Sequence, residues 1–178
     1  MLVVAAFGTN NPMLSQFVFC STADVYGTQL DWIPVCEDHP TRPVGRYGEK
    51  KLAAERVLQA HAAAAAAAGD RAFPLTIMRP ASVYGEVGSS ATLLDPLGRG
   101  DGQWVEDMRN GKPVVVAGAG GILTQFMHAE NAAEAFVGVL GQAHTHGKIY
   151  NVCPKDMHSW SDVRTCAICR RSRFMGLF

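Results

Sequence analysis

The sequence lacks an excess of either charge, because its sixteen Lys and Arg residues are matched by sixteen Asp and Glu residues. A chain with zero net charge has no global field that would draw it toward nucleic acid or an anionic membrane surface. It also lacks any apolar run near the ~20 residues that a membrane-spanning helix needs. The apolar start, residues 1–7, has no positive flank and is a poor signal peptide. What remains is a chain of 178 residues, 48% apolar, which is long enough for one domain with a substantial core.

The five cysteines are too scattered for a disulfide framework, and their number is odd. We therefore expect a reducing compartment, the cytoplasm or an organellar stroma, rather than secretion. Cys20 lies in an apolar run and is expected in the core. Cys153, His158, Cys166 and Cys169 could in principle bind zinc, but their spacing fits no standard finger, so no metal site is predicted.

The order of the apolar segments predicts a βαβ unit. Residues 17–22, FVFCST, have the length and composition of a buried strand, and residues 73–85 contain a second one. Between them, residues 46–68 are expected to form a helix that ends at Gly69. A strand, a helix and another strand in this order indicate a parallel sheet.

The second half of the chain is predicted to add a hairpin, a helix and a strand. Residues 113–129 contain the glycine-rich AGAGG, which we interpret as a hairpin turn. A phosphate-binding loop would need a small residue where Leu123 stands, and a helix after it. Residues 130–144 have the pattern of an amphipathic helix, and residues 147–154 that of a short strand. The helix carries on one side Ala133, Phe136, Val137 and Leu140.

Tyr47 and Lys51 are four residues apart in the predicted helix, so they share one face. A Tyr hydroxyl has a free pKa near ~10, which is too high for a base at neutral pH. We expect the Lys51 ammonium to lower the pKa of Tyr47 by stabilising its phenolate. Tyr47 could then exchange a proton with a substrate hydroxyl that Thr22 or Ser21 holds. The alternative interpretation is a half-buried Tyr packed beside the stem of a Lys.

Five segments carry a further signal: FVFCSTADVYG, YGEKKLAAERVL, LTIMRPASVYG, TQFMHAENAAEAFVGVL and YNV. Over residues 10–163 their order and spacing resemble the extended short-chain dehydrogenase/reductase family, in particular its NAD-dependent epimerase/dehydratase group. That family has a catalytic Ser or Thr four residues before the Tyr of the VYG turn, where Thr22 stands here. Its catalytic Tyr follows about 25 residues later, which matches Tyr47, since 47 − 22 = 25.

The resemblance implies a role for each matching residue. Thr22, Tyr47 and Lys51 would be catalytic, with Tyr47 as the acid/base. Tyr47 and Lys51 would also contact the cofactor, NAD or NADP, and Pro80 and Ala81 would lie along its nicotinamide. These assignments place the chemistry where the predicted strands end.

Residues of the later segments would serve the substrate, a sugar derivative or another secondary alcohol. Ser82 and Gln125 would contact it together with Thr22. His128 is expected to hold the substrate-binding lobe in place. The sugar, and the choice between NAD and NADP, stay open at this point.

The resemblance also implies the fold class, α/β: the C-terminal part of a Rossmann-like parallel sheet with helices, plus a small α/β substrate lobe. Within a single partial domain, residues 1–85 would form the catalytic half, residues 86–163 mostly the substrate lobe, and residues 164–178 an atypical basic tail. The Gly-rich strand and turn that cradle the pyrophosphate in the family do not precede residue 17. We therefore expect one strand of the sheet to have an unpaired edge.

The expected function is that of an epimerase/dehydratase-like oxidoreductase, in which Tyr-mediated proton transfer is coupled to hydride transfer. One alternative is a truncated, non-catalytic relative that binds a partner chain or a metabolite. Apart from this choice, a homo-oligomer or a partner chain is expected. A second is an RNA-associated relative of the epimerases, suggested by the pair Thr124–Gln125. This second alternative is disfavoured, because the chain lacks the stripe of Lys and Arg interleaved with aromatic residues that is typical of RNA-binding surfaces.

Overall fold

The computed structural model describes residues 13–70, 72–84, 107, 110–115 and 120–162. The chain divides into two compact units. The first consists of residues 1–81 and 133–152, and the second of residues 82–132 and 153–178. The tail 164–178 and most of the segment 86–112, for which loop and helix are expected, lie outside the described residues.

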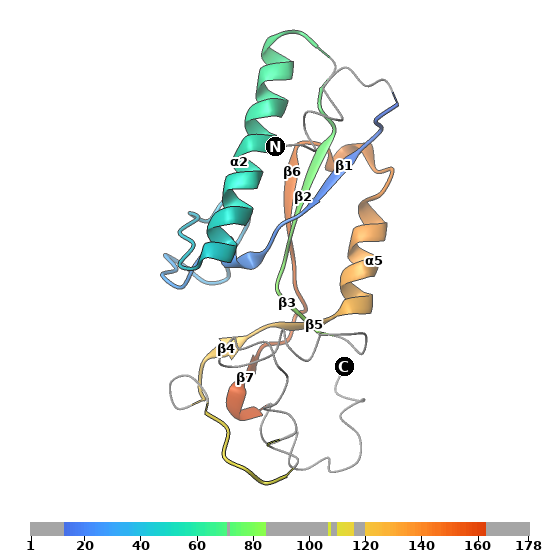
Figure 1. Ribbon diagram of the computed structural model, residues 1–178. Helices are drawn as coiled ribbons and strands as arrows, with labels where there is room; N and C mark the ends of the chain where they lie inside the picture. The colour runs from blue at the N-terminus through green and yellow to red at the C-terminus, as the bar shows by residue number, and fades with distance from the viewer. Residues whose placement is uncertain (1–12, 71, 85–106, 108–109, 116–119, 163–178) are drawn as a thin grey trace. The chain divides into compact units, whose positions relative to one another are not determined.

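The first unit contains a parallel sheet of three strands in the order β1-β2-β6 (Figure 1). These strands are β1 (Phe17–Cys20), β2 (Leu75–Pro80) and β6 (Lys148–Val152). β2 is the central strand, and all six of its residues are buried. The predicted parallel sheet is therefore confirmed, because β1 and β6 both run parallel to β2.

The helix α2 (Arg46–Ala67) connects β1 to β2 and agrees with the predicted range. It ends in a Schellman motif, in which Gly69 N–H bonds to Ala66 O and Asp70 N–H to Ala65 O. Gly69 has a φ of +75°, a conformation that glycine adopts without steric cost. The helix packs on the sheet through a core of Leu58, Phe73, Leu75 and Ile77.

The 3-10 turn η1 (Ala23–Val25) follows β1 and leads into the long connection to α2. Val25 and Tyr26 form a second buried cluster with Leu52 of α2. The first turn of α2 approaches η1 closely at Gly48, where an added Cβ would lie 2.7 Å from the Asp24 carbonyl oxygen. The N-terminal end of α2 is thus fitted directly against the carboxyl end of β1.

Two expectations, for Cys20 and for the amphipathic helix, are wrong. Cys20 is exposed, because β1 lies at the side of the sheet and its alternating pleat turns this side chain outward. The helix α5 (Ala129–Val139) is shorter than predicted, and Val137 and Leu140 are 66% and 57% exposed. Gln16 fastens the C-terminal end of this helix, since its side chain bonds to Val139 O and to Gly141 N–H.

The second unit contains two short sheets. β3 (Ser82–Tyr84) pairs parallel with β5 (Phe126–His128), and β4 (Leu123–Thr124) pairs antiparallel with β7 (His158–Ser159). The predicted strand 73–85 is therefore split between β2 and β3, which belong to different sheets. The strand expected after the glycine turn is divided into β4 and β5, which pair with β7 and β3 rather than with the strand expected before the turn. Of that first strand, residues 113–115 are not in a strand, and residues 116–119 lie outside the described part.

The fold also contains the short turn η2 (Ala143–Thr145) before β6. None of the helices in the described part of the chain is long and apolar enough to span a membrane.

Candidate active site at the carboxyl end of the sheet

Lys51 lies against the end of β1. Its ammonium donates a hydrogen bond of 2.6 Å to the Cys20 carbonyl oxygen. The same Nζ is 5.4 Å from the centroid of the Phe19 ring and 5.7 Å from that of the Tyr47 ring. An ammonium has three N–H donors, so two remain for another acceptor.

Thr22 follows β1 and caps η1. Its Oγ1 accepts a hydrogen bond of 3.2 Å from the Asp24 N–H, and the side chain is buried. A hydroxyl that accepts in this way keeps its own proton available for donation. Thr22 can therefore hold a substrate oxygen while it keeps its structural bond. The neighbouring Ser21 Oγ is also buried and has no hydrogen-bond partner among the residues that the structure describes.

Tyr47 is 57% exposed, and its hydroxyl makes no hydrogen bond with the described residues. Partial burial, with smaller electrostatic contributions from Cys20 and Asp24, raises the pKa of Tyr47 above its ordinary value. This is opposite to the lowering expected from Lys51. The reason is geometric, since the ammonium is bonded to the Cys20 carbonyl rather than to the phenol oxygen. Tyr47 is thus a protonated phenol at neutral pH in this structure.

Pro80 and Ala81 stand at the carboxyl end of β2. Pro80 is paired in register with Val152 of β6, and the Ala81 N–H donates a hydrogen bond of 2.9 Å to the Val152 carbonyl oxygen. In a parallel sheet the carboxyl ends of neighbouring strands meet at one edge. The first unit therefore places Thr22 and Pro80–Ala81 at the same edge, with Lys51 beside the end of β1.

A buried polar network behind this edge is not predicted by the sequence patterns above. Arg79 forms a bidentate ion pair with Glu55, with Nε–Oε1 3.0 Å and Nη2–Oε2 2.7 Å. Its Nη1 donates to the Tyr26 hydroxyl at 2.8 Å. Although burial acts to lower it, bonds to Glu55 and Tyr26 hold the pKa of Arg79 above its ordinary value. The sequence signal for this network is an Arg inside the apolar strand LTIMRP.

The network continues to β6 and to the connection between η1 and α2. Tyr26 donates to the Asn151 Oδ1 at 2.7 Å, and burial raises the pKa of Tyr26, so it stays a donor. Asn151 binds the connection twice, through its backbone N–H to Glu37 Oε1 and through Nδ2 to Val35 O. The connection is thereby held to the carboxyl end of the sheet.

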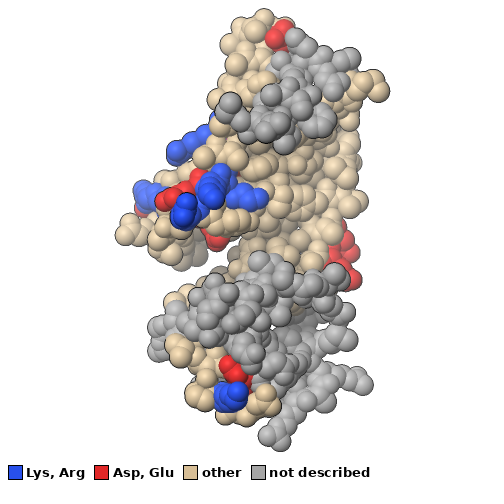
Figure 2. Space-filling view, in the orientation of Figure 1, with Lys and Arg blue, Asp and Glu red and all other residues tan. Residues whose placement is uncertain are grey.

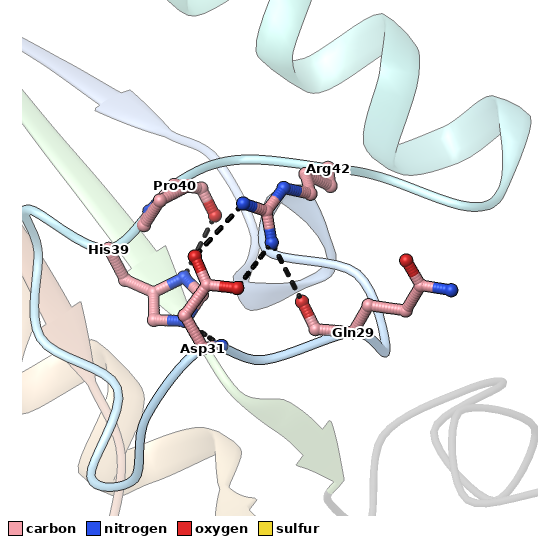
Figure 3. Close-up of polar contacts among 5 residues, drawn as sticks. All are labelled: Gln29, Asp31, His39, Pro40 and Arg42. Carbon is pink, nitrogen blue, oxygen red and sulfur yellow. Dashed lines mark hydrogen bonds and ion pairs between the residues drawn. The ribbon is translucent and has the colours of Figure 1, made fainter.

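Within the connection, Asp31 and Arg42 form an exposed bidentate ion pair at 2.7 and 2.9 Å (Figure 3). The buried His39 accepts from the Asp31 N–H at Nε2 and lies 2.8 Å from Pro40 O through Nδ1. These bonds are consistent with a neutral imidazole whose proton is on Nδ1. They fix the shape of the loop that separates Thr22 from Tyr47 in the chain.

Ser82 and Gln125 belong to the second unit. Ser82 begins β3 and is paired in register with Phe126, the residue after Gln125. Gln125 donates from Nε2 to Pro154 O at 2.6 Å, which leaves its oxygen as an acceptor. His128 accepts from the Glu130 N–H at 3.4 Å and contacts the Tyr84 ring edge to face, 5.3 Å between centroids. These contacts favour the structural role expected for His128 within this unit.

The model of the NAD dependent epimerase/dehydratase family matches residues 2–153. The chain belongs to this family. Epimerase/dehydratase relatives include the chloroplast stem-loop binding protein of 41 kDa b from Arabidopsis thaliana. It is 28% identical over 142 residues, which are 79% of this chain and 32% of that protein. The dTDP-D-glucose 4,6-dehydratase of Mus musculus is 28% identical over 153 residues, 85% of this chain and 38% of that enzyme.

Among solved structures, the UDP-glucuronic acid 4-epimerase of Bacillus cereus, in complex with UDP-glucuronic acid and NAD, has a TM-score of 0.66 at 23% identity. The match covers 85% of this chain and 44% of that one. It confirms the α/β, Rossmann-like fold class of the epimerase/dehydratase family. The chain spans less than half the length of these relatives. In the described part of the chain, no group of three or more His, Cys, Asp or Glu side chains is arranged to hold a metal ion.

Proposed function

We propose that the chain contributes the catalytic half of an NAD(P)-dependent epimerase/dehydratase acting on a sugar derivative or another secondary alcohol. The observation that carries this proposal is the position of Lys51 at the end of β1, where its ammonium uses one donor on the Cys20 carbonyl and keeps two that bond to none of the described residues. Thr22 and Tyr47 lie in the adjoining turn and helix. The two enzymes compared above are named for nucleotide sugars, which favours that class of substrate.

The described residues fit a nicotinamide nucleotide in donor chemistry. The free N–H groups of Lys51 suit the hydroxyl oxygens of a ribose, and Pro80–Ala81 end β2 at the same edge. NAD or NADP, when bound, supplies the hydride acceptor and a positive ring. The chain's own residues then handle the proton: Thr22 donates to the substrate oxygen, and the Tyr47 phenol exchanges a proton with it.

The raised pKa of Tyr47 makes the phenol an acid in the absence of ligand. It becomes a base only when a positive charge comes close to its oxygen. Ser82 and Gln125 are proposed as substrate contacts on the family resemblance alone, with the Gln125 oxygen as acceptor. Gln125 already gives one N–H to Pro154 O, so its amide has a defined orientation.

Cofactor titration tests this proposal on the chain itself. Purified protein is titrated with NADH by fluorescence and with NAD⁺ by thermal shift. Ligand at ten times its Kd would stabilise the fold by about 1.4 kcal/mol. Saturation below millimolar concentration that is weakened in Lys51→Met, with Lys50→Met as control, supports the proposal. Absence of any response at several millimolar rejects it.

Assembly with a second chain is part of the proposal. β1 pairs with β2 on one side, and within the described ranges its other edge has no strand partner. That edge belongs to an uncharged segment, FVFC, which is open to strand addition. We propose a homo-oligomer or a partner chain there. Light scattering that shows a monomer at all concentrations and with cofactor present would reject this part.

An RNA-associated role is the second candidate, favoured by the similarity to the chloroplast stem-loop binding protein. Figure 2 shows basic side chains gathered together with acidic ones rather than a purely basic surface. Exposed residues of α2 include Arg46, Lys50 and Arg56. Retention on single-stranded RNA that falls steeply with salt would support this role, and salt-independent or absent retention would reject it.

We also propose a reducing compartment, cytoplasm or stroma. Cys20, Cys36 and Cys153 are free thiols in the structure, and all three are exposed. Exposed free thiols persist where glutathione keeps them reduced. Localisation of a tagged full-length product to an oxidising compartment would contradict this assignment.

A further inference from the structure

Three buried polar residues stand close in sequence to three parts of the candidate site. Glu55 follows Lys51 by one helical turn of α2, and Tyr26 follows Thr22 at the end of η1. Arg79 is the residue before the last one of β2. If one of these residues is displaced, the site residue near it in sequence is displaced too, because only a few residues of backbone separate them.

The same three residues bind one another. Arg79 joins Glu55 through two parallel N–H···O bonds of 3.0 and 2.7 Å, and joins Tyr26 through a third of 2.8 Å. Their exposed fractions are 0% for Glu55 and 4% for each of the other two. The Arg79 Nη1 also donates to the Glu37 carbonyl oxygen at 3.3 Å, and a planar guanidinium with four fixed acceptors determines orientation as well as distance. Burial makes these bonds stronger and keeps water from replacing them.

The apolar contacts of α2 do not set its position along the sheet so sharply. Leu58 packs on the sheet, but apolar contacts of this kind have no direction, and residues 62–67 that follow are all alanines with small side chains. The ion pair of Glu55 supplies that register, one turn from Lys51. At the other side of Lys51, Gly48 allows the helix to approach the Asp24 carbonyl, where a Cβ would clash.

We propose that Glu55, Arg79 and Tyr26 form a positioning triad for the candidate active site. Glu55 fixes the position of α2 along its own axis relative to the sheet, and so holds the Lys51 ammonium on the Cys20 carbonyl. Tyr26 fixes the turn that carries Thr22. Arg79 joins both to the central strand. None of the three touches the reacting atoms, and their assigned role rests on the proposed function of Lys51 and Thr22.

The position of the Lys51 ammonium is directly measurable by ¹H–¹⁵N NMR of lysine side chains, without any cofactor. Its bond of 2.6 Å should give a signal distinct from that of the exposed Lys50. Lys51→Arg and Lys50→Arg assign the two signals. In Glu55→Gln, we expect the Lys51 signal to move more than halfway toward that of Lys50. Asp31→Asn, which breaks an exposed bidentate pair of similar geometry, should leave it unchanged.

Arg79→Lys separates geometry from charge, since it keeps a cation beside Glu55 but loses the planar fork. The positioning role predicts that the Lys51 signal moves here too, although the fold is kept. This variant also decides the matter if Glu55→Gln does not fold. A Lys51 signal at the wild-type position in folded Arg79→Lys would overturn the proposal. Failure of wild-type protein to bind NADH, with the Lys51 signal responding as expected, would reject only the proposed function.

Discussion

Replacing Arg79 by Met should destabilise the first unit far more than an ordinary surface substitution. The change leaves the Glu55 carboxylate, which has no exposed surface, without the two N–H donors that compensate its burial. Breaking a buried ion pair in this way typically costs about 3–5 kcal/mol. For a chain of this length each kcal/mol corresponds to roughly 2–4 °C in Tm, so a loss of about 6–20 °C is expected.

The chain provides a matched control. Arg42 and Asp31 form an ion pair of the same bidentate kind, but their side chains are 47% and 40% exposed. Water replaces the lost bonds there, so Arg42→Met should lower the Tm far less than Arg79→Met does. Thermal unfolding followed by far-ultraviolet circular dichroism, at one protein concentration, compares the two variants.

The double variant Glu55→Leu/Arg79→Met completes the experiment. It removes both charges, so no uncompensated carboxylate remains, and it should be more stable than Arg79→Met alone. Equal losses of Tm in Arg79→Met and Arg42→Met would refute the reasoning. A double variant less stable than the single one would refute it as well, because the cost would then come from lost packing rather than from buried charge.

Two further predictions concern backbone and pH. Gly27→Ala should destabilise the fold strongly, because Gly27 has a φ of +75° and an added Cβ would meet the Arg42 carbonyl. Gly138→Ala, in open space on α5, should instead stabilise the fold by about 0.5–1 kcal/mol. Denaturant unfolding measures both changes, and equal effects would contradict this prediction. Burial raises the pKa of Tyr84 from 10.0 to about 12, so stability should be intact below pH 10 and fall as the pH rises to about 12. Tyr84→Phe should flatten that fall in an alkaline unfolding series, and an unchanged slope would contradict the assignment.

The sequence was sufficient for the parallel βαβ unit. Its signals are local: apolar runs of strand length, and a helix whose end is marked by Gly69, as the structure has it. The family resemblance also indicates the pairing of β6 with β2. The sequence did not predict which side chains of a strand face the core, since the exposure of Cys20 depends on β1 being an edge strand of the described sheet.

The roles of the site residues stay a prediction. The motif predicts that Tyr47 and Lys51 share a helix face, but it does not tell that the Lys51 ammonium binds the Cys20 carbonyl and that the pKa of Tyr47 is raised. The network of Glu55 and Arg79 was missed because the two residues are distant in sequence. A charged residue on a buried helix face and another in an apolar strand each require a partner, and only the fold shows that they meet.

The sheet has a consequence for the order of folding. β2 binds β1 across one helix, but its other neighbour, β6, lies beyond residues 81–147. Closing so long a segment is slow relative to forming the βαβ unit, so β6 should be the last strand to dock. During synthesis the edge of β2 that later binds β6 therefore stays unpaired until residue 152 has left the ribosome. Only then can Asn151 accept the hydrogen bond from Tyr26.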